Sequence, residues 1–226
     1  MQGEMGPLMM GISSPAAGRR PLAAAILAGG QSSRMGRDKA LLRLEEDGPT
    51  FLETTIAKLA VVANPVFVVA PFDRDYQRFG VDVVPDAFPG GGGLGGIATG
   101  LIAADGCDVI AVACDHPFLS VSLLRWMASI DDEYDALAPR TRGQSRQGGD
   151  QIVQTLHAIY RPDCLPVLRD EIARGYRNSM SFFNRVRLRA IDEDELRAID
   201  PELLSLLSAN TPDSLEEARR ISRATR

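Results

Sequence analysis

The stretch LAAAILAGGQSSRMGRDK, residues 22–39, decides the fold of this 226-residue chain. Its first seven residues are apolar, which predicts a buried β-strand over residues 22–28. Gly29 and Gly30 end that strand and open a polar loop. When such strands alternate with helices, ligands bind in the crevice beyond the carboxyl ends of the strands. The residues that follow each predicted strand are therefore the ones to inspect for function.

The loop that follows the first strand has the composition of a phosphate-binding site. Small residues at 28–30 let backbone N–H groups approach a ligand closely, and Ser32 and Gly36 add a donor or remove bulk. Arg34 supplies a bidentate fork and Lys39 a point charge. The loop is neither a P-loop nor a G-x-G-x-x-G dinucleotide turn, because the spacing of its glycines and lysine differs from both. The alternative interpretation is a plain strand–helix turn with a solvated arginine and lysine.

The rest of the chain alternates between strand-like and helix-like segments. Further strands are predicted over residues 66–70, 81–84, 108–114, 156–160 and 188–191, and helices over residues 50–62, 97–104 and 120–130, with a last helix opened by Thr211 and Pro212. The first of these helices carries Thr50 and Glu53 at the spacing of a capping box. This alternation predicts an α/β fold of three layers, with helices on both faces of a mostly parallel sheet.

Composition excludes several classes of protein. Hydrophobic residues make up 45% of the chain and charged residues 24%, enough for a core, and the formal net charge of −5 disfavours general binding to nucleic acid or to an anionic membrane. Residues 1–20 lack the pattern of a secretory signal, and no apolar run approaches the roughly 20 residues that span a membrane. We expect a flexible tail over 1–20, a single domain over 21–226 and a cytoplasmic location. The scattered Cys107, Cys114 and Cys164 fit a reducing compartment.

Asp115 follows the most apolar predicted strand, in the segment Cys114-Asp115-His116-Pro117-Phe118. A carboxylate at the end of a central parallel strand faces the ligand crevice. Because Mg²⁺ prefers one or two carboxylates together with phosphate oxygens and water, we predict Asp115 as a Mg²⁺ ligand. The alternative is an N-cap for the next helix, which Pro117 and the intervening residues make a poor fit.

Residues 27–39 match every specified position of the L-A-G-G-x-S-x-R-M-G-x-D-K signature, and the chain thereby resembles the molybdenum cofactor guanylyltransferases. The segment around Asp115 is similar to the C-D-x-P-F/Y motif of that family, in which the aspartate holds the metal. Asp86 stands where the family has a nucleotide-contacting aspartate. The glycines up to Gly95 resemble its G-P-L-x-G segment, and Asn210 lies in a segment similar to its N-x-N-T-P-E/D motif.

The resemblance implies a Rossmann-like nucleotidyltransferase fold and a Mg²⁺-dependent transfer of GMP from GTP to the phosphate of molybdopterin, with release of pyrophosphate. It implies that Lys39, Arg34 and Asp115 are catalytic and that Asp115 holds the metal. It also implies nucleotide contacts from a larger set, namely Leu27, Ala28, Gly29, Gly30, Ser32, Gly36, Lys39, Asp86, Gly95, Asp115 and Asn210. Whether the chain works as a monomer or contacts other cofactor-biosynthesis proteins stays open.

Several departures from the family pattern keep alternatives open. Gly93 replaces the usual proline, Ser208 replaces the first asparagine of the C-terminal motif, and Ala70 stands where relatives often have an asparagine near the nucleotide. Asp86 would also suit a turn, and Asn210 a helix-capping loop. The alternative functions are CMP transfer from CTP to molybdopterin, a sugar-phosphate or other small-phosphate nucleotidyltransferase, and a non-catalytic nucleotide-binding protein on the same fold.

The remaining polar residues have simpler interpretations. His116 is expected to be local structure or a minor ligand contact, and His157 a core histidine within its strand. The arginines between Arg140 and Arg146, or Arg177 and Arg185, offer positive charge for the acceptor, although solvated surface side chains are the ordinary explanation for each.

Overall fold

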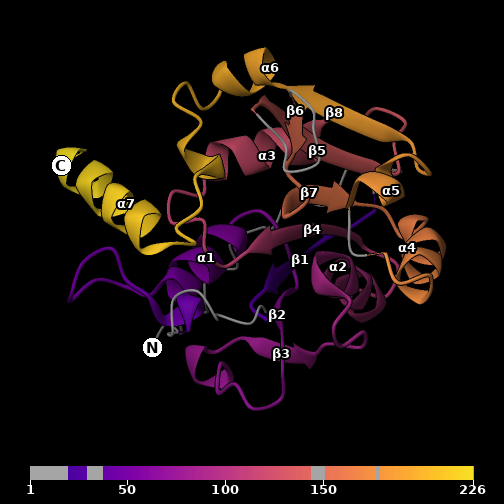
Figure 1. Ribbon diagram of the computed structural model, residues 1–226, viewed down its shortest axis with the longest axis horizontal. Coiled ribbons are helices and arrows are strands. Elements are labelled where there is room, and N and C mark those ends of the chain that lie inside the picture. Colours follow the sequence, from indigo (N-terminus) through magenta and orange to yellow (C-terminus); the bar gives the residue numbers. More distant parts are fainter. Residues whose placement is uncertain (1–19, 30–37, 144–150, 177–178, 226) are drawn as a thin grey trace, which may run out of the picture.

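The computed structural model describes residues 20–29, 38–143, 151–176 and 179–225. Within them the chain forms an eight-stranded sheet in the order β3-β2-β1-β4-β7-β5-β6, with β8 paired to β5 (Figure 1). The strands are β1 (Leu22–Leu27), β2 (Val66–Ala70), β3 (Asp82–Pro85), β4 (Asp108–Ala113), β5 (Ala136–Arg142), β6 (Gln151–Val153), β7 (His157–Tyr160) and β8 (Leu188–Asp192). Of the tail expected over residues 1–20, residues 1–19 lie outside the described residues.

The sheet is mixed but mostly parallel, as the alternating pattern predicts. β1 pairs in parallel with β2 and β4, β2 with β3, and β5 with β8. β7 is antiparallel to both β4 and β5, and β6 is antiparallel to β5. Because β7 runs in reverse between two strands of the same direction, β5 points the same way as β4. The carboxyl ends of β1, β2, β3, β4 and β5 therefore lie along one edge of the sheet.

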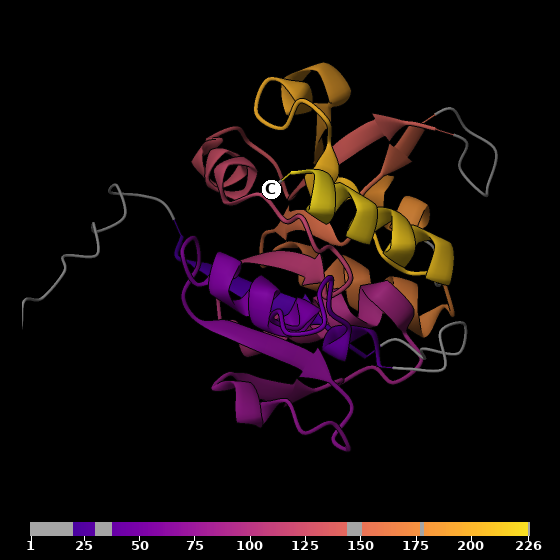
Figure 2. The same cartoon turned by 90° about the vertical axis from the view of Figure 1, so that its left-hand side faces the viewer.

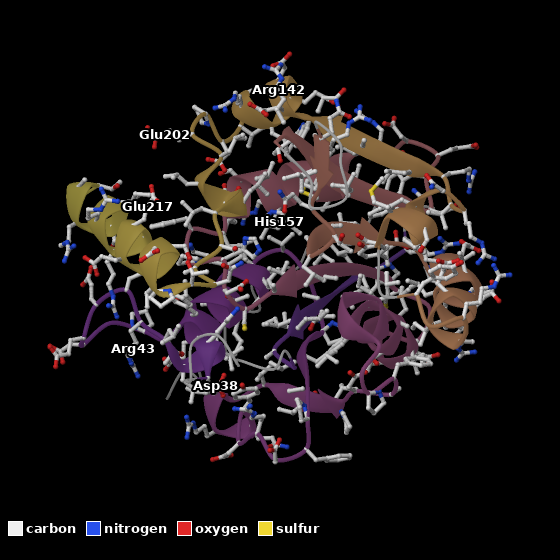
Figure 3. The ribbon with its side chains drawn as sticks, in the orientation of Figure 1. Asp38, Arg43, Arg142, His157, Glu202 and Glu217 are labelled. Atoms are coloured by element: carbon white, nitrogen blue, oxygen red, sulfur yellow. The ribbon has the colours of Figure 1, made fainter. Side chains whose placement is uncertain are left out.

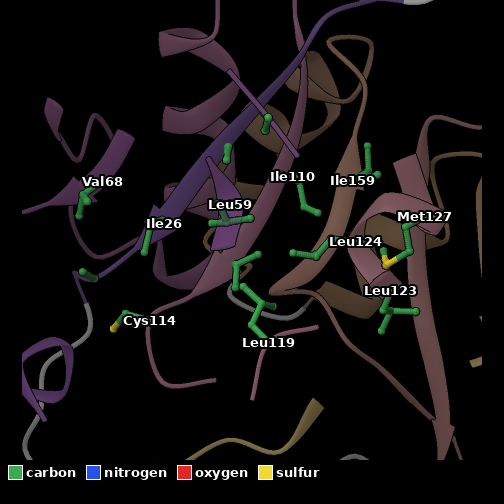
Figure 4. Packing of buried hydrophobic residues seen from close by; sticks show 14 of the residues in the cluster. Ile26, Leu59, Val68, Ile110, Cys114, Leu119, Leu123, Leu124, Met127 and Ile159 are labelled. Atoms are coloured by element: carbon green, nitrogen blue, oxygen red, sulfur yellow. The ribbon is translucent and has the colours of Figure 1, made fainter. Parts of the chain in front are cut away.

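Helices cover both faces of the sheet, so the predicted three-layer α/β fold in a single domain is confirmed (Figures 1 and 2). Alternation along β1 sends Ala24 and Ile26 to one face and Ala23 and Ala25 to the other. The first face is covered by α1 (Phe51–Leu59) and α3 (Val121–Ser129), and the second by α2 (Gly92–Ala103), α4 (Cys164–Ala173) and α5 (Ser179–Phe183). Figure 4 shows the core on the first face, where Leu59 of α1 and Leu123 of α3 belong to the same buried cluster as Ile110 of β4.

After β8, the C-terminal part of the chain adds short elements that begin at the edge of the sheet where the carboxyl ends of β1 to β5 lie. α6 (Glu193–Arg197) and the 3₁₀ turn η3 (Leu204–Leu206) lead to α7 (Pro212–Ala224), whose N-cap is Thr211 as predicted. α7 packs Leu215 and Ala218 against Phe51 of α1. Two further 3₁₀ turns, η1 (Lys39–Leu41) and η2 (Gln77–Phe79), follow β1 and β2. Among the described residues, no helix has the length and apolar character that crossing a membrane requires.

α2 lies unusually close to β1, and its start differs from our prediction. A Cβ atom placed on Gly96 would lie 2.4 Å from Cδ2 of Leu27, and one on Gly100 would lie 2.9 Å from the Ala25 Cβ. Glycine at both positions therefore lets the helix rest directly on the strand. The helix begins at Gly92 and not at residue 97, because packing against the sheet outweighs the poor helix propensity of glycine.

Candidate functional site

A cavity of about 420 Å³ opens at the carboxyl edge of the sheet, next to the ends of β1 to β4 and the start of β7. β1 to β4 each contribute a residue within one position of their carboxyl ends, which is the arrangement expected for a ligand site in a parallel sheet. The lining residues are Leu27, Ala28, Gly29, Asp38, Lys39, Ala40, Val69, Asp86, Gly90, Gly92, Gly93, Gly96, Ala113, Cys114, Asp115 and Leu156.

The start of the signature loop forms part of this wall. The Ala28 N–H donates to the Val69 carbonyl at 3.0 Å, and the Leu27 carbonyl accepts from the Cys114 N–H at 3.3 Å. These bonds fix the residues before the loop in the sheet, so that Gly29 is the first to leave it. The predicted contacts at Gly30, Ser32, Arg34 and Gly36 lie outside the described residues.

Lys39 and Asp115 meet at the cavity although they follow different strands. The Lys39 Nζ lies 3.5 Å from Oδ2 of Asp115, and both side chains are largely shielded from solvent. Lys39 opens η1, whose N-cap is Asp38. The Asp115 carbonyl accepts from the Ala209 N–H at 2.8 Å, which ties the C-terminal segment to the site. Since Ser120 caps α3, Asp115 is free of the helix-capping role that was its alternative.

Asp86 takes the turn role that the sequence leaves open, while its nucleotide contact stays a prediction. Its Oδ1 atom accepts from the Phe88 N–H at 2.9 Å and lies 3.1 Å from the Thr99 hydroxyl of α2, so the residue does form a turn. The same side chain lines the cavity. The carboxylate is thus held in place by α2, and its Oδ2 atom has no hydrogen bond to the described residues that would prevent a contact with a ligand.

Two predicted contacts lie behind the cavity wall. Gly95 faces Phe88, whose carbonyl oxygen would lie 2.9 Å from a Cβ atom at this position, while Gly93 and Gly96 beside it line the cavity. Asn210 is also outside the lining, but the Ala209 N–H that precedes it donates to the Asp115 carbonyl. The structure therefore brings Asn210 near Asp115 through its backbone neighbour, and Gly95 supports the turn of Asp86.

The two histidines are buried next to each other below Asp115. Nε2 of His116 lies 3.9 Å from Oδ1 of Asp115, and the imidazole rings of His116 and His157 are 5.8 Å apart. Burial lowers the pKa of His116, while Asp115 opposes the shift. Burial also lowers the pKa of His157 to about 3, so its imidazole is neutral near pH 7. The expectation that His157 is a core histidine is confirmed.

The arginines considered for the acceptor are engaged in ion pairs. Arg140 contacts Asp192 at 2.6 Å, and Arg185 contacts Asp170 at 2.5 Å and Glu171 at 2.6 Å. Arg142, which Figure 3 labels at the top of the molecule, lies 3.5 Å from Asp194. Arg146 and Arg177 lie outside the described residues. These pairs favour the surface interpretation for the described arginines.

Comparison with known proteins agrees with this geometry. Residues 24–190 match the family described as the MobA-like NTP transferase domain. The chain belongs to this family. It is 33% identical to the probable molybdenum cofactor guanylyltransferase of Pelotomaculum thermopropionicum, over 89% of this chain and 93% of that protein. It is 31% identical to the molybdenum cofactor guanylyltransferase of Desulfosudis oleivorans, over 89% of this chain and 96% of that protein. This MobA-like chain is therefore a nucleotidyltransferase, and the predicted resemblance is confirmed.

Solved structures show the same nucleotidyltransferase fold. Molybdopterin-guanine dinucleotide biosynthesis protein A from Archaeoglobus fulgidus superposes on this MobA-like chain with a TM-score of 0.73 at 24% identity, over 89% of this chain and 99% of that one. The 4-diphosphocytidyl-2C-methyl-D-erythritol synthase from Anaerococcus prevotii gives a TM-score of 0.68 at 13% identity, over 90% and 96% of the two chains. At these identities the likeness concerns the fold alone.

The donor set of the MobA-like site fits Mg²⁺ held jointly with a nucleotide. Asp115 presents a carboxylate to the cavity, and the described residues contain no group of three or more side chains suited to enclosing a metal. Mg²⁺ does not need such a cage, since it usually keeps several waters and binds through one or two carboxylates and substrate phosphates.

Sequence reasoning missed part of the wall of this site. Asp38 belongs to the signature but carried no predicted contact, and the same holds for Gly90, Gly92 and Gly93, which also line the cavity. The high density of glycines between two predicted elements was the available signal for the second group. Leu156 carried no signal, because its place depends on the antiparallel insertion of β7 beside β4.

Proposed function

We propose that this chain transfers GMP from GTP to the terminal phosphate of molybdopterin and releases pyrophosphate, in the cytoplasm and with Mg²⁺ as cofactor. The observation that carries the proposal is the meeting of Lys39 and Asp115 in the cavity at the strand ends, 3.5 Å apart. Lys39 can bind a phosphate group and Asp115 can bind a metal ion at the same place, which suits the transfer of a nucleotide. The named activity of the Pelotomaculum and Desulfosudis relatives supports this choice of substrates.

In this proposal the chain works mainly by positioning and by charge. An oxygen of the acceptor phosphate attacks the α-phosphorus of GTP, and the bond to the β-phosphate breaks as pyrophosphate leaves. Lys39 and Arg34 neutralise charge on the triphosphate, while Asp115 holds Mg²⁺, which when bound neutralises and polarises phosphate oxygens. An ionised phosphate needs no general base. The burial that keeps His116 neutral is consistent with a passive role for that side chain.

The base is the part of the proposal that distinguishes GTP from CTP. Guanine offers the N1–H and N2–H₂ donors that cytosine lacks, and Asp86 places a carboxylate acceptor in the cavity wall. Sites built to pair such donors reject an analogue that leaves their polar atoms unpaired. We therefore expect a preference for GTP over CTP of about 10²-fold or more in kcat/KM.

Steady-state transfer to molybdopterin with each nucleotide tests the proposal. Asp86→Asn keeps an oxygen for the Phe88 N–H and the Thr99 hydroxyl but removes the negative charge, so it should narrow the preference mainly by slowing GTP. Gly30→Ala should also narrow the preference for GTP over CTP, because the resemblance places the base near this residue. Equal rates with the two nucleotides, or a preference for CTP, would favour the cytidylyl alternative and leave nucleotidyl transfer standing.

A further inference from the structure

Asp38 is the acceptor in three hydrogen bonds at the side of the cavity. Its Oδ2 atom accepts from Nη1 of Arg74 at 2.8 Å and from the Tyr76 hydroxyl at 2.7 Å. Its Oδ1 atom accepts from the Ala40 N–H at 3.1 Å, which caps η1. Figure 3 labels Asp38 beside the first helix, below the centre of the molecule. The connection between β2 and β3 thus holds the residue directly before Lys39.

We propose that Tyr76 and Arg74 are positioning residues for nucleotide binding, because they hold Asp38 and with it the turn that aims Lys39 into the cavity. The inference rests on the proposed nucleotidyl transfer, in which Lys39 meets the triphosphate. Neither Tyr76 nor Arg74 lines the cavity, so both act through Asp38.

The turn that carries Lys39 cannot set its own direction. η1 has only three residues, and its own backbone bonds run from the Leu41 N–H to the Asp38 carbonyl and from the Leu42 N–H to the Lys39 carbonyl, both at 3.1 Å. Isolated turns of this length are marginal, because few hydrogen bonds offset the conformational entropy that they cost. The Phe51 N–H donates to the Leu42 carbonyl at 2.8 Å and holds the far end of the turn, whereas Asp38 anchors the end that carries Lys39.

Tyr76 is suited to be that anchor. Its side chain is 1% exposed and packs in the core beneath α1, while its hydroxyl reaches Asp38. Burial, together with the hydrogen bond to Asp38, raises the pKa of the phenol, so the hydroxyl is a donor near neutral pH. A buried aromatic ring loses little freedom on making the bond, which makes it a firm support for a carboxylate.

Arg74 adds an electrostatic contribution. Among the described residues that line the cavity, the carboxylates of Asp38, Asp86 and Asp115 face a single cationic side chain, Lys39. A triphosphate would be repelled by an uncompensated Asp38. The Arg74 guanidinium, 2.8 Å from that carboxylate and outside the cavity lining, neutralises it, so Asp38 adds little to the negative charge that a triphosphate would meet.

A buried tyrosine also stabilises a fold, and the test must separate the two roles. Tyr76→Phe keeps the ring in the core and removes only the hydroxyl, and Arg74→Gln removes the charge. Arg78→Gln is the matched control: Arg78 belongs to the same connection, is half exposed, and pairs with Asp75 at 4.0 Å without touching Asp38. Amide hydrogen exchange of the free protein reports on the anchor. Calorimetric titration with GTP and with CTP, each with MgCl₂ and no acceptor, reports on binding.

We expect Tyr76→Phe and Arg74→Gln to speed exchange at Ala40 and Leu41 and to raise the nucleotide Kd by about tenfold, the scale of a lost hydrogen bond to a charged group. Arg78→Gln should match the wild type in both measurements. Unchanged exchange at Ala40 in Tyr76→Phe, or an unchanged Kd, would overturn the inference. If the wild type binds neither nucleotide, the proposed function fails, whereas the exchange measurement still decides whether the anchor exists.

A double-mutant cycle shows whether Arg74 acts through Asp38. If it does, Arg74→Gln combined with Asp38→Asn should raise the Kd little beyond the effect of Asp38→Asn alone. A double variant whose Kd shows the product of the two single effects would contradict the positioning role, because independent residues add in free energy.

Discussion

Nζ of Lys39 lies 3.5 Å from Oδ2 of Asp115, so the cation proposed for the triphosphate is held by the carboxylate proposed for the metal. The side chains retain only 24% and 15% of their exposure. In the free protein each neutralises the other. A nucleotide that arrives with Mg²⁺ would offer each a stronger partner, phosphate for the lysine and the metal for the carboxylate. The pair therefore leaves neither of these two charges uncompensated before the ligand binds.

The first prediction concerns Asp115→Asn. The amide has nearly the same shape as the carboxylate, and the backbone bond to Ala209 is unaffected, so the variant should fold. Transfer activity should fall by about 10²-fold or more, because loss of the charge weakens metal binding at the phosphates. Activity measured across a Mg²⁺ titration checks this, with circular dichroism to confirm folding. Near-normal turnover at limiting Mg²⁺ would disprove the assignment.

A second prediction compares the two lysines of the chain. Lys39→Ala should lower kcat by about 10²-fold or more, because the cavity loses a cation that stabilises the departing pyrophosphate. Because Lys39 is largely shielded and pairs with Asp115, the substitution should also lower the free energy of unfolding by about 1–3 kcal/mol, and circular dichroism should confirm that the variant still folds. Lys58→Ala, away from the cavity lining, should keep the wild-type rate. Equal rates for the two variants would argue against a role for Lys39.

Arg34→Ala should resemble Lys39→Ala in its effect on the rate if the resemblance assigns its role correctly. The expected loss in kcat is again about 10²-fold or more, with little change in stability. Loss of folding in this variant, in place of loss of rate, would favour a structural role for the signature loop.

The next prediction uses the close contact between α2 and β1. Gly96→Ala places a Cβ atom 2.4 Å from Cδ2 and 2.8 Å from Cγ of Leu27, so either the Leu27 side chain or the helix must shift. Overpacking of this kind costs about 1–3 kcal/mol of stability, and nucleotide affinity should fall because both residues line the cavity. Gly93→Ala is the control, since its Cβ would meet Leu156 at an ordinary 3.8 Å. Urea unfolding and nucleotide titration should separate the two variants, and equal stability would contradict the packing argument.

The last prediction concerns pH. Burial lowers the pKa of His157 to about 3, below the ordinary value of about 6.5. As the pH falls below about 6.5, His157 becomes protonated in the unfolded chain but stays neutral in the folded protein. The free energy of unfolding therefore falls. Between pH 7.5 and 5.0 the wild type should lose about 2 kcal/mol more stability than His157→Gln. Parallel stability profiles in urea would show that His157 titrates normally.

Much of the fold could be predicted because local signals agreed with the packing. The apolar run over residues 66–70 is β2, and the Thr50–Glu53 capping box opens α1 as expected. β5 and α4 were missed since each contains a proline, Pro139 and Pro166, which ordinarily argues against an element. Pro166 is tolerated within the first turn of α4, where backbone N–H groups have no partner inside the helix.

The sequence predicts those site residues that directly follow a strand. It does not predict residues that are brought together only by contacts between distant segments. The strand-end rule and the signature found Asp115, Lys39 and the start of the loop. Nothing in the sequence connects Asp38 with Arg74 and Tyr76, which lie 36 and 38 residues further along the chain. Their contact follows from the way the β2–β3 connection packs next to the first strand, and that packing is visible only in the folded protein.

The position of β1 in the sheet has a consequence for biosynthesis. β1 pairs with β2 on one side and with β4 on the other, and Leu22 is opposite Asp108. Such pairing between distant segments forms slowly, since the intervening chain must close a long loop first. During translation β1 therefore keeps one edge unpaired until β4 has left the ribosome. The proposed nucleotide site is incomplete until then. A nucleotide would therefore stabilise the fully folded protein but would not bind to, or stabilise, its first half during synthesis.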